Sequence, residues 1–588
     1  MNNFISGLLA TLVLLLVPVS NYGQEAHHSR ISIAHPGFEL LKLDLKSVVD
    51  LADKEEQKQW VNIQDYIDMF QIGIDGSRPV RVDVLTGVSP TCFMVWIPLA
   101  KPEDAKKGLP DEFRDSLDAF GYVTRWESSQ NKNLFEIASS EGAKDMGWFR
   151  VIPEIEYGVF VLTTDKEDMQ LLKQLIIKAS DPRTEVSKLL GPGISMGAEL
   201  INDAESAEDQ AKRKSASAEL RKISMDTIQK RPEESTTEHE IRRQLMKSQL
   251  DESERLMVEA KEIRMLGNLD RQTNRATLNI TATGIADTSL DKTIRAIGVR
   301  PSDFASIARF DGSVMSIRMN HPIDSLRQGN VVDFLNLVRK DIDSRIDASK
   351  ELSADEQSST KKLLSGLMDV TVGGINSGHI NAMLEAVTND KGEFTVIGSV
   401  SAPEATRLND LLPLLKSTGK GNDAEMNVGK AGNVSIHRIK LAEGYVELID
   451  RVFGSKRDVF VGVDAERIWL AAGPGALELM SATIEKLGPP AMTDSAIYAE
   501  AHLLPWMKRL DEIAKALPEE TTKEKKEIQR ARARTRARAI AALQSDDLAV
   551  IDIRSKDGIF TGALSFETGI MRFAGKAIAA FAKENLQQ

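Results

Sequence analysis

Alternation of apolar and polar residues predicts β-strands along much of the chain, and several of these strands run directly into an amphipathic helix. The clearest strand–helix pairs are Tyr157–Thr163 with Asp165–Ile176, Phe394–Ser401 with Pro403–Leu415, Arg467–Ala472 with Gly475–Leu487, and Ile559–Phe566 with Gly569–Ala582. Looser copies occur at Phe93–Leu99 and Val314–Met319. The copies recur irregularly and share no polar residue. We therefore interpret them as a repeated way of building a core rather than a repeated reactive site.

Short polar turns join some of the predicted strands into hairpins. The turn Asn389–Gly392 connects His379–Val387 to Glu393–Val400, and a second turn connects Leu548–Ile553 to Ile559–Phe566. The glycine in such a turn supplies the left-handed residue that an antiparallel hairpin needs. Hairpins followed by helices, without regular βαβ spacing, predict antiparallel sheets with helices on one face. We expect an α+β fold.

The length of 588 residues exceeds what one core supports, so several domains are expected. The predicted regions are a signal peptide at 1–23, an N-terminal α+β domain at 24–197, a charged helical segment at 198–262, and a C-terminal α+β region at 263–588. The C-terminal α+β region is long enough to form two subdomains, and it contains a predicted basic helix at 519–545. In the N-terminal domain, apolar spacing predicts a helix over Leu43–Phe70.

The first residues have the pattern of a secretory signal peptide. Phe4–Val19 is apolar, Pro18 interrupts it, and the small residue Gly23 precedes Gln24. An uncleaved membrane anchor is the alternative, although about 16 apolar residues are short for a membrane span. We expect export to a periplasmic or extracellular location, with no transmembrane span after signal cleavage. The single cysteine, Cys92, excludes an intramolecular disulfide.

The segment 198–262 contains interleaved charges of both signs and few aromatic or β-branched residues. Pro232 divides it into two predicted helices. An apolar stripe is present, but its heptad spacing slips. Two hypotheses stay open: a helix pair packed within the protein, or a coiled coil that binds a partner.

A basic helix near the C-terminus is the strongest candidate binding element. Its five arginines are Arg530, Arg532, Arg534, Arg536 and Arg538. On a helix they fall within about 12 Å of axis, so together they could bind an anionic polymer or lipid surface. The alternative is a solvated helix whose arginines pair with Glu519, Glu520, Asp546 and Asp547. Nucleic acid is an unlikely partner because the net charge is −12 and no aromatic residue interrupts the arginines.

Gly193–Gly197 matches the G-x-S-x-G pattern of a hydrolase nucleophile elbow, with Ser195 as the nucleophile. Such an elbow requires a buried strand before the serine and a helix after it. Pro192 and the lack of β-branched residues argue against the strand, whereas a helix is expected from Ala198 onward. We interpret the motif as a glycine-rich link, and an exported serine hydrolase remains the alternative.

Other chemistry is not indicated by the sequence. Gly373–Gly378 lacks the lysine and the spacing of a phosphate-binding loop, and Gly473–Gly475 is best interpreted as a tight turn before a helix. The eight histidines form no H-E-x-x-H motif. We therefore predict no catalytic residue, no cofactor and no metal ligand.

Two parts of the sequence are distinctive: Ile74–Pro79 followed by Met94–Leu99, and Gly562–Phe566 followed by Met571–Lys576. With these stretches the chain resembles large exported proteins of uncharacterised function from planctomycete-type bacteria. This resemblance implies an exported multidomain α+β protein and supplies no catalytic residue. The predicted function is that of a non-catalytic, envelope-associated structural or binding protein that presents its sheets and a charged helix to an unknown protein or envelope partner.

Overall fold

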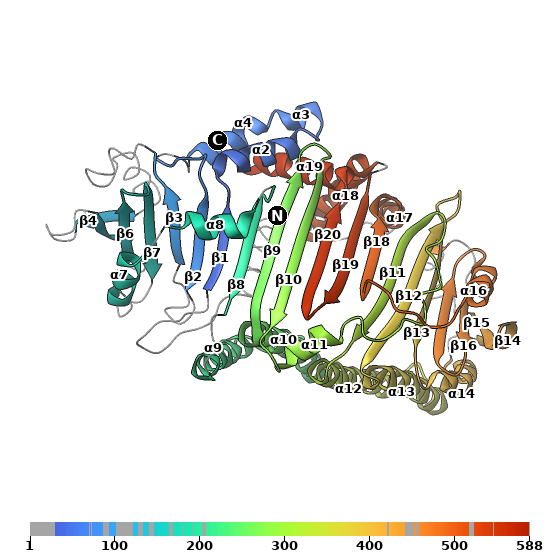
Figure 1. The fold of residues 1–588 in the computed structure, drawn as a ribbon. Coiled ribbons are helices and arrows are strands. Elements are labelled where there is room, and N and C mark those ends of the chain that lie inside the picture. Colours follow the sequence, from blue (N-terminus) through green and yellow to red (C-terminus); the bar gives the residue numbers. More distant parts are fainter. Residues whose placement is uncertain are drawn as a thin grey trace. The chain divides into compact units, whose positions relative to one another are not determined.

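The computed structural model describes most of the chain from Arg30 to Leu586. The described residues are 30–69, 71, 73–85, 93–100, 122–126, 133–139, 146–163, 169–179, 181–191, 193–202, 207–419, 423–440, 452–453, 458–516, 523–544 and 546–586. The predicted signal peptide, Cys92, Glu519 and Glu520 lie outside these residues. The fold is α+β, and each strand ladder with a printed register is antiparallel, as the hairpin pattern predicts (Figure 1).

The described residues form two compact units. Unit 1 contains residues up to Ser224, Ser253–Leu290 and Ser565 onward, and unit 2 contains Met225–Glu252 and Asp291–Leu564. The boundaries fall within the two helices of the charged segment, within the helix Ser289–Ala296 and within the last strand, so neither unit is one continuous stretch of sequence.

Ten described strands form the sheet of unit 1. They are β1 (Arg30–His35), β2 (Val80–Leu85), β3 (Phe93–Pro98), β4 (Tyr122–Trp126), β5 (Leu134–Ser139), β6 (Met146–Ile152), β7 (Tyr157–Thr163), β8 (Met196–Ile201), β9 (Ala260–Asp270) and β10 (Arg275–Gly284). Their order across the sheet is β4-β5-β6-β7-β3-β2-β1-β8-β9-β10.

The strands of unit 2 repeat this arrangement. They are β11 (Ser313–Pro322), β12 (His379–Thr388), β13 (Phe394–Ser401), β14 (Asp423–Ala431), β15 (Val434–Lys440), β16 (Asp458–Val463), β17 (Arg467–Ala472), β18 (Ile497–His502), β19 (Leu548–Lys556) and β20 (Ile559–Phe566). Their order is β14-β15-β16-β17-β13-β12-β11-β18-β19-β20. Each strand therefore has a counterpart ten places later in the chain, and the two units have the same topology.

The helices between these strands also correspond. The described helices of the first half are α2 (Phe38–Val49), α3 (Lys54–Gln57), α4 (Trp60–Met69), α7 (Met169–Ile177), α8 (Arg183–Leu190), α9 (Ala207–Asp226), α10 (Thr236–Glu259) and α11 (Ser289–Ala296). Those of the second half are α12 (Ser325–Ala348), α13 (Ala354–Asn376), η1 (Ala405–Arg407), α14 (Leu408–Leu411), η2 (Leu412–Ser417), α16 (Ala476–Glu485), α17 (Leu503–Ala516), α18 (Lys523–Leu543) and α19 (Thr568–Asn585). The pair α9–α10 separates β8 from β9, and the pair α17–α18 separates β18 from β19, at the equivalent point.

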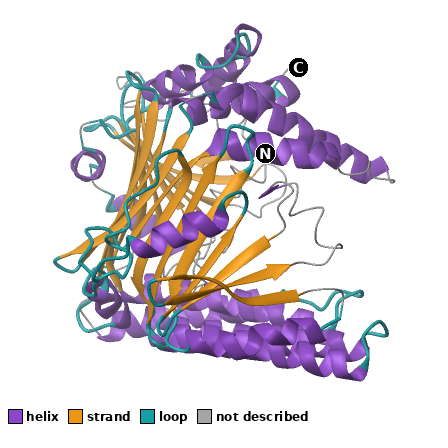
Figure 2. Ribbon diagram, turned by 90° about the vertical axis from the view of Figure 1, so that its right-hand side faces the viewer, coloured by secondary structure: helices purple, strands orange, loops and turns teal. Residues whose placement is uncertain are grey.

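Each unit has its own apolar core. In unit 1, α7 packs on β3, β6 and β7 through Leu172 and Ile176. In unit 2, the equivalent α16 packs on β13 and β17 through Met480 and Ile484, and Phe304 meets Trp469 edge-to-face there. The long helices α12 and α13 lie side by side, at the lower edge of Figure 2.

The charged segment forms two helices, of which α10 contacts α12 within unit 2. Ion pairs join Glu238 to Arg345, Glu240 to Lys340, and Glu252 to Arg327, in antiparallel order along the two helices. These contacts favour packing within the chain over a coiled coil with a partner.

Several local predictions are wrong. The segment Leu43–Phe70 is not one helix. The first helix ends at its C-cap residue Asp50, and a new helix begins after the N-cap residue Asp53. No helix starts at Ala198, because residues 196–201 form strand β8 between β1 and β9. Gly373 and Gly374, where the sequence does not indicate a phosphate-binding loop, belong to the last turn of α13.

Candidate functional site

A row of three polar residues crosses the centre of the unit 2 sheet. Ser316 of β11 lies directly opposite Glu385 of β12 on one side and Glu500 of β18 on the other. Directly paired residues of antiparallel strands point to the same face of the sheet, so the three side chains are neighbours. All three are buried, and Glu385 has no accessible surface.

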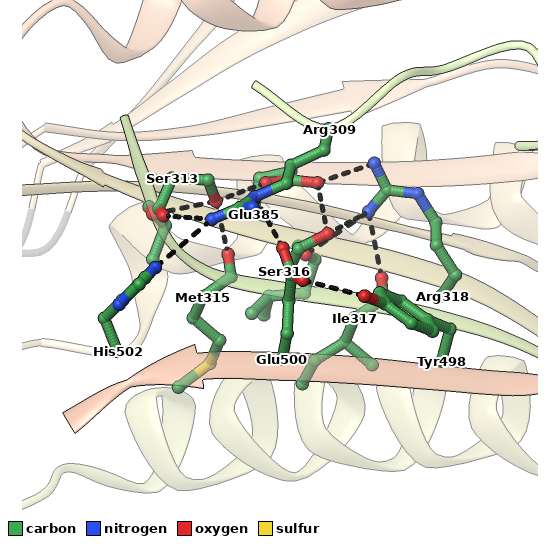
Figure 3. A network of polar contacts seen from close by, with 12 residues as sticks. Arg309, Ser313, Met315, Ser316, Ile317, Arg318, Glu385, Tyr498, Glu500 and His502 are labelled. Carbon is green, nitrogen blue, oxygen red and sulfur yellow. Dashed lines mark hydrogen bonds and ion pairs between the residues drawn. The ribbon is translucent and has the colours of Figure 1, made fainter. Parts of the chain in front are cut away.

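Glu385 is held by hydroxyl groups and a guanidinium group (Figure 3). Ser316 Oγ donates to Oε1 at 2.7 Å, and Ser313 Oγ donates to Oε2 at 2.5 Å. Arg318 Nη2 lies 2.6 Å from Oε1. A buried carboxylate needs such partners, since burying an unpaired charge carries a large desolvation cost.

Glu500 has a separate set of partners. Arg309 Nε lies 2.5 Å from its Oε1, and the Tyr498 hydroxyl donates to Oε2 at 2.8 Å. Burial, and then the hydrogen bond to Glu500, raise the pKa of Tyr498 to about 12. Tyr498 therefore stays protonated at physiological pH and acts as a hydrogen-bond donor.

The network continues to the rim of the sheet, where it becomes accessible to solvent. Arg309 Nη2 lies 3.5 Å from His502 Nε2, and His502 Nδ1 lies 2.8 Å from Asp547 Oδ1. Asp547 also accepts a hydrogen bond from the backbone amide of Leu504, the second residue of α17. The network thus fixes the start of α17 to the sheet.

Unit 1 contains an equivalent row. Ser32 of β1 lies opposite Asp83 of β2 and Glu199 of β8, the counterparts of β11, β12 and β18. Arg81 contacts Asp83 through two hydrogen bonds of 2.8 and 2.7 Å, and Arg264 approaches Glu199 to 3.6 Å. The carboxylate–serine–carboxylate row is therefore present in both units, with an arginine near each carboxylate.

A His-Pro pair also occurs at the end of the first strand of each unit, although at a different distance from the serine. His35 is three residues after Ser32 and ends β1, and His321 is five residues after Ser316 near the end of β11. Burial lowers the pKa of both histidines. Sequence reasoning did not find these rows, although the repeated pairs Ser32-Ile33 and Ser316-Ile317 were available as a weak signal.

The chemistry of the two rows is that of buried ion-pair networks rather than of a nucleophilic site. In unit 2, both hydroxyls that contact Glu385 donate to it, and each carboxylate of the row contacts an arginine. The Arg318 guanidinium also donates to the Ile307 carbonyl, and the Asn320 amide donates to the Arg300 carbonyl. These hydrogen bonds hold the segment that contains Arg300 and Ile307, which precedes β11, against the sheet.

Ser195 does not lie on a nucleophile elbow. Helix α8 precedes it and strand β8 begins directly after it, which is the reverse of the order that an elbow requires. Its backbone amide donates to the Gly267 carbonyl, and its Oγ accepts a hydrogen bond from the Leu269 amide at 3.3 Å. The residue therefore extends the β8–β9 pairing.

The predicted basic helix forms as α18, which contains eight basic and two acidic residues. Arg530, Arg532 and Arg534 are exposed, whereas Arg536 and Arg538 are partly buried. Arg536 forms an ion pair with Asp511 of α17 at 3.4 Å. Asp547, which the sequence offered as a partner for the arginines, is instead engaged by His502 and Leu504.

The described residues contain neither a metal-binding cluster nor a membrane-spanning helix. Within them, no group of three or more His, Cys, Asp or Glu side chains is arranged to hold a metal ion. Among the described helices, none combines the length and apolar character that a membrane span requires. No protein-family model, curated protein or solved structure matches the chain.

Proposed function

We propose that this protein is an exported, non-catalytic binding protein of the cell envelope, and that α18 attaches it to an anionic polymer or lipid surface. The observation that carries the proposal is the exposure of Arg530, Arg532 and Arg534 on one short stretch of helix. With the other described residues, neither Arg532 nor Arg534 forms an ion pair, so their guanidinium groups are available to an anionic partner.

The part of α18 that contains these arginines extends beyond the supporting contacts of the helix. Residues 530–535 are all exposed, whereas Ala539, Ala542 and Leu543 are buried. The helix is thus anchored at its C-terminal end and presents a positive surface at its N-terminal end. Exposed charges of one sign attract an oppositely charged surface, and added salt screens that attraction.

Co-sedimentation with vesicles tests this proposal. The purified protein should sediment with phosphatidylglycerol vesicles at low salt, should remain in solution with phosphatidylcholine vesicles, and should be released at high salt. Replacing Arg530, Arg532 and Arg534 by glutamine should abolish sedimentation. A matched control replaces the exposed Lys350, Lys391 and Lys556 by glutamine, which removes the same charge from other parts of unit 2. Equal loss in both variants, or no loss in the arginine variant, would contradict a site on α18.

A further inference from the structure

Both faces of the unit 2 sheet carry apolar residues, and one of them bears the carboxylate row. The face opposite the carboxylate row is apolar over three consecutive cross-strand rows and six strands. Written from β19 to β17, the rows are Ala549, Ala501, Met315, Ala386, Val396, Ala472; Ile551, Ala499, Ile317, Leu384, Gly398, Leu470; and Ile553, Ile497, Met319, Ala382, Val400, Ile468. We call these residues the apolar face.

Several residues of the apolar face are exposed, whereas the carboxylates on the other face are buried. Leu470 is 52% exposed, Ile551 39% and Val400 38%, whereas Glu385 is 0% and Glu500 6% exposed. A one-sided antiparallel sheet ordinarily buries its apolar side and hydrates its polar side. The carboxylate row lies on the face that also carries the apolar core of unit 2, where Met383, Ile397 and Trp469 are buried. The opposite face nevertheless keeps exposed apolar residues, which indicates that the apolar face has a ligand of its own.

Unit 1 shows the same arrangement at the equivalent positions. Ile33, Val82 and Val95 form a cross-strand row on the face opposite Ser32 and Asp83. The three apolar residues are only half-buried, but Ser32 and Asp83 are 1% and 2% exposed. Because the pattern recurs in both copies of the topology, it is a property of the fold and not an accident at a single sheet.

The surroundings of the apolar face in unit 2 indicate the charge of its ligand. Trp506 of α17 packs with Met315 and Val396 at one end of the face and stacks on Phe394 at 4.3 Å. Helix α18, with its eight basic residues, packs on α17. An apolar surface next to a cluster of cationic groups is complementary to an amphiphile with an acyl chain and an anionic headgroup.

We propose that the apolar face binds the acyl chain of an anionic lipid. This site gives the lipid a hydrophobic contact with the sheet, which α18 alone does not provide. The anionic headgroup is the one part of the proposal that rests on the proposed function of α18. The chain lies along the Leu470, Val400 and Leu384 side chains, and the headgroup faces the arginines.

Binding of cis-parinaric acid, a fluorescent fatty acid, to the full-length protein tests the proposal. The wild type should increase the fluorescence of the probe saturably. The double variant Val400→Thr, Leu470→Thr places a β-branched side chain at both strand positions and should weaken binding at least about fivefold, because two apolar contacts are lost. The matched control replaces Met492 and Val299, two other exposed apolar residues of unit 2, by threonine, and should bind like the wild type.

Three outcomes would overturn the proposal: no fluorescence increase with the wild type, unchanged affinity in the double variant, or equal weakening in the control. Sedimentation equilibrium provides a further check, because a wild-type dimer that the double variant converts to a monomer would identify a second copy of the chain as the occupant. Circular dichroism verifies folding, and the single variant Leu470→Thr replaces the double variant if the latter misfolds. The glutamine variant of α18 should still bind cis-parinaric acid, so failure of the vesicle experiment and failure of this one are distinguishable.

Discussion

Ser32 and Ser316 occupy the same position in two sheets of identical strand order. Each lies on the first strand of its unit, directly between a carboxylate on the second strand and a carboxylate on the eighth. The two residues are far apart in the sequence, and their equivalence follows only from the topology. The carboxylate–serine–carboxylate row is therefore a repeated structural element that the two units use to build their sheets.

The buried carboxylates of these rows should contribute strongly to stability. Glu385→Gln removes the charge that compensates Arg318, and breaking a buried ion pair costs about 3 kcal/mol or more. We expect a clear decrease in the free energy of unfolding by urea. Asp83→Asn should have a similar effect through Arg81 in unit 1.

The control for both substitutions is Glu351→Gln, which changes an exposed carboxylate and should alter the free energy of unfolding by no more than about 0.5 kcal/mol. If Glu385→Gln behaves like this control, the Glu385 network does not stabilise the sheet.

Much of the fold was predictable because strand alternation and turn chemistry are local properties. Strand Tyr157–Thr163 begins and ends where the pattern predicts, and the hairpin at Asn389–Gly392 pairs β12 with β13. The α+β class follows from these local signals. Strand β8 was missed because Met196–Leu200 has no alternation of its own, and its strand conformation depends on pairing with β1 and β9.

The candidate site was predictable only in part. The arginines of α18 form a local cluster, so helical periodicity was enough to find them. The carboxylate rows were not found, because each strand contributes a single polar residue and the three strands are distant in the sequence. The internal repeat of the topology was also missed, because the predicted strand–helix copies do not include the strands of Ser32, Glu199 and Glu500. The topology aligns Ser32 with Ser316 and Glu199 with Glu500.

Two glycines in the long helices of unit 2 should respond oppositely to alanine. At Gly329 of α12 an added Cβ meets no atom within 4 Å, so Gly329→Ala should stabilise the protein by about 0.5–1 kcal/mol through helix propensity. At Gly366 of α13 the added Cβ would lie 2.5 Å from Leu411 Cδ2, and Gly366→Ala should destabilise by about 1–3 kcal/mol. Thermal unfolding measures both changes. Stabilisation by Gly366→Ala would show that the Leu411 side chain can move away from the added methyl group at little energetic cost.

Ser195 should be unreactive toward a fluorophosphonate probe. Its Oγ accepts a hydrogen bond from the Leu269 amide, and the backbone order around it is the reverse of a nucleophile elbow. Intact-protein mass spectrometry should show no adduct after incubation, with a known serine hydrolase as the positive control. A stoichiometric adduct that disappears in Ser195→Ala would instead support the hydrolase alternative.

Tyr498 should make the protein less stable in alkaline solution. Its pKa is raised to about 12 in the folded state, whereas an unfolded tyrosine titrates near 10. Between these values the unfolded state loses the proton and the folded state keeps it, so the stabilising effect of the protonated hydroxyl is complete below pH 10 and is lost as the pH rises toward 12.

The free energy of unfolding should therefore fall between pH 10 and pH 12, and Tyr498→Phe should reduce this fall because it removes the titrating group. Urea unfolding of both proteins at pH 9 and pH 11 gives the comparison. An equal fall in wild type and variant would show that Tyr498 ionises as readily in the folded protein as in the unfolded chain.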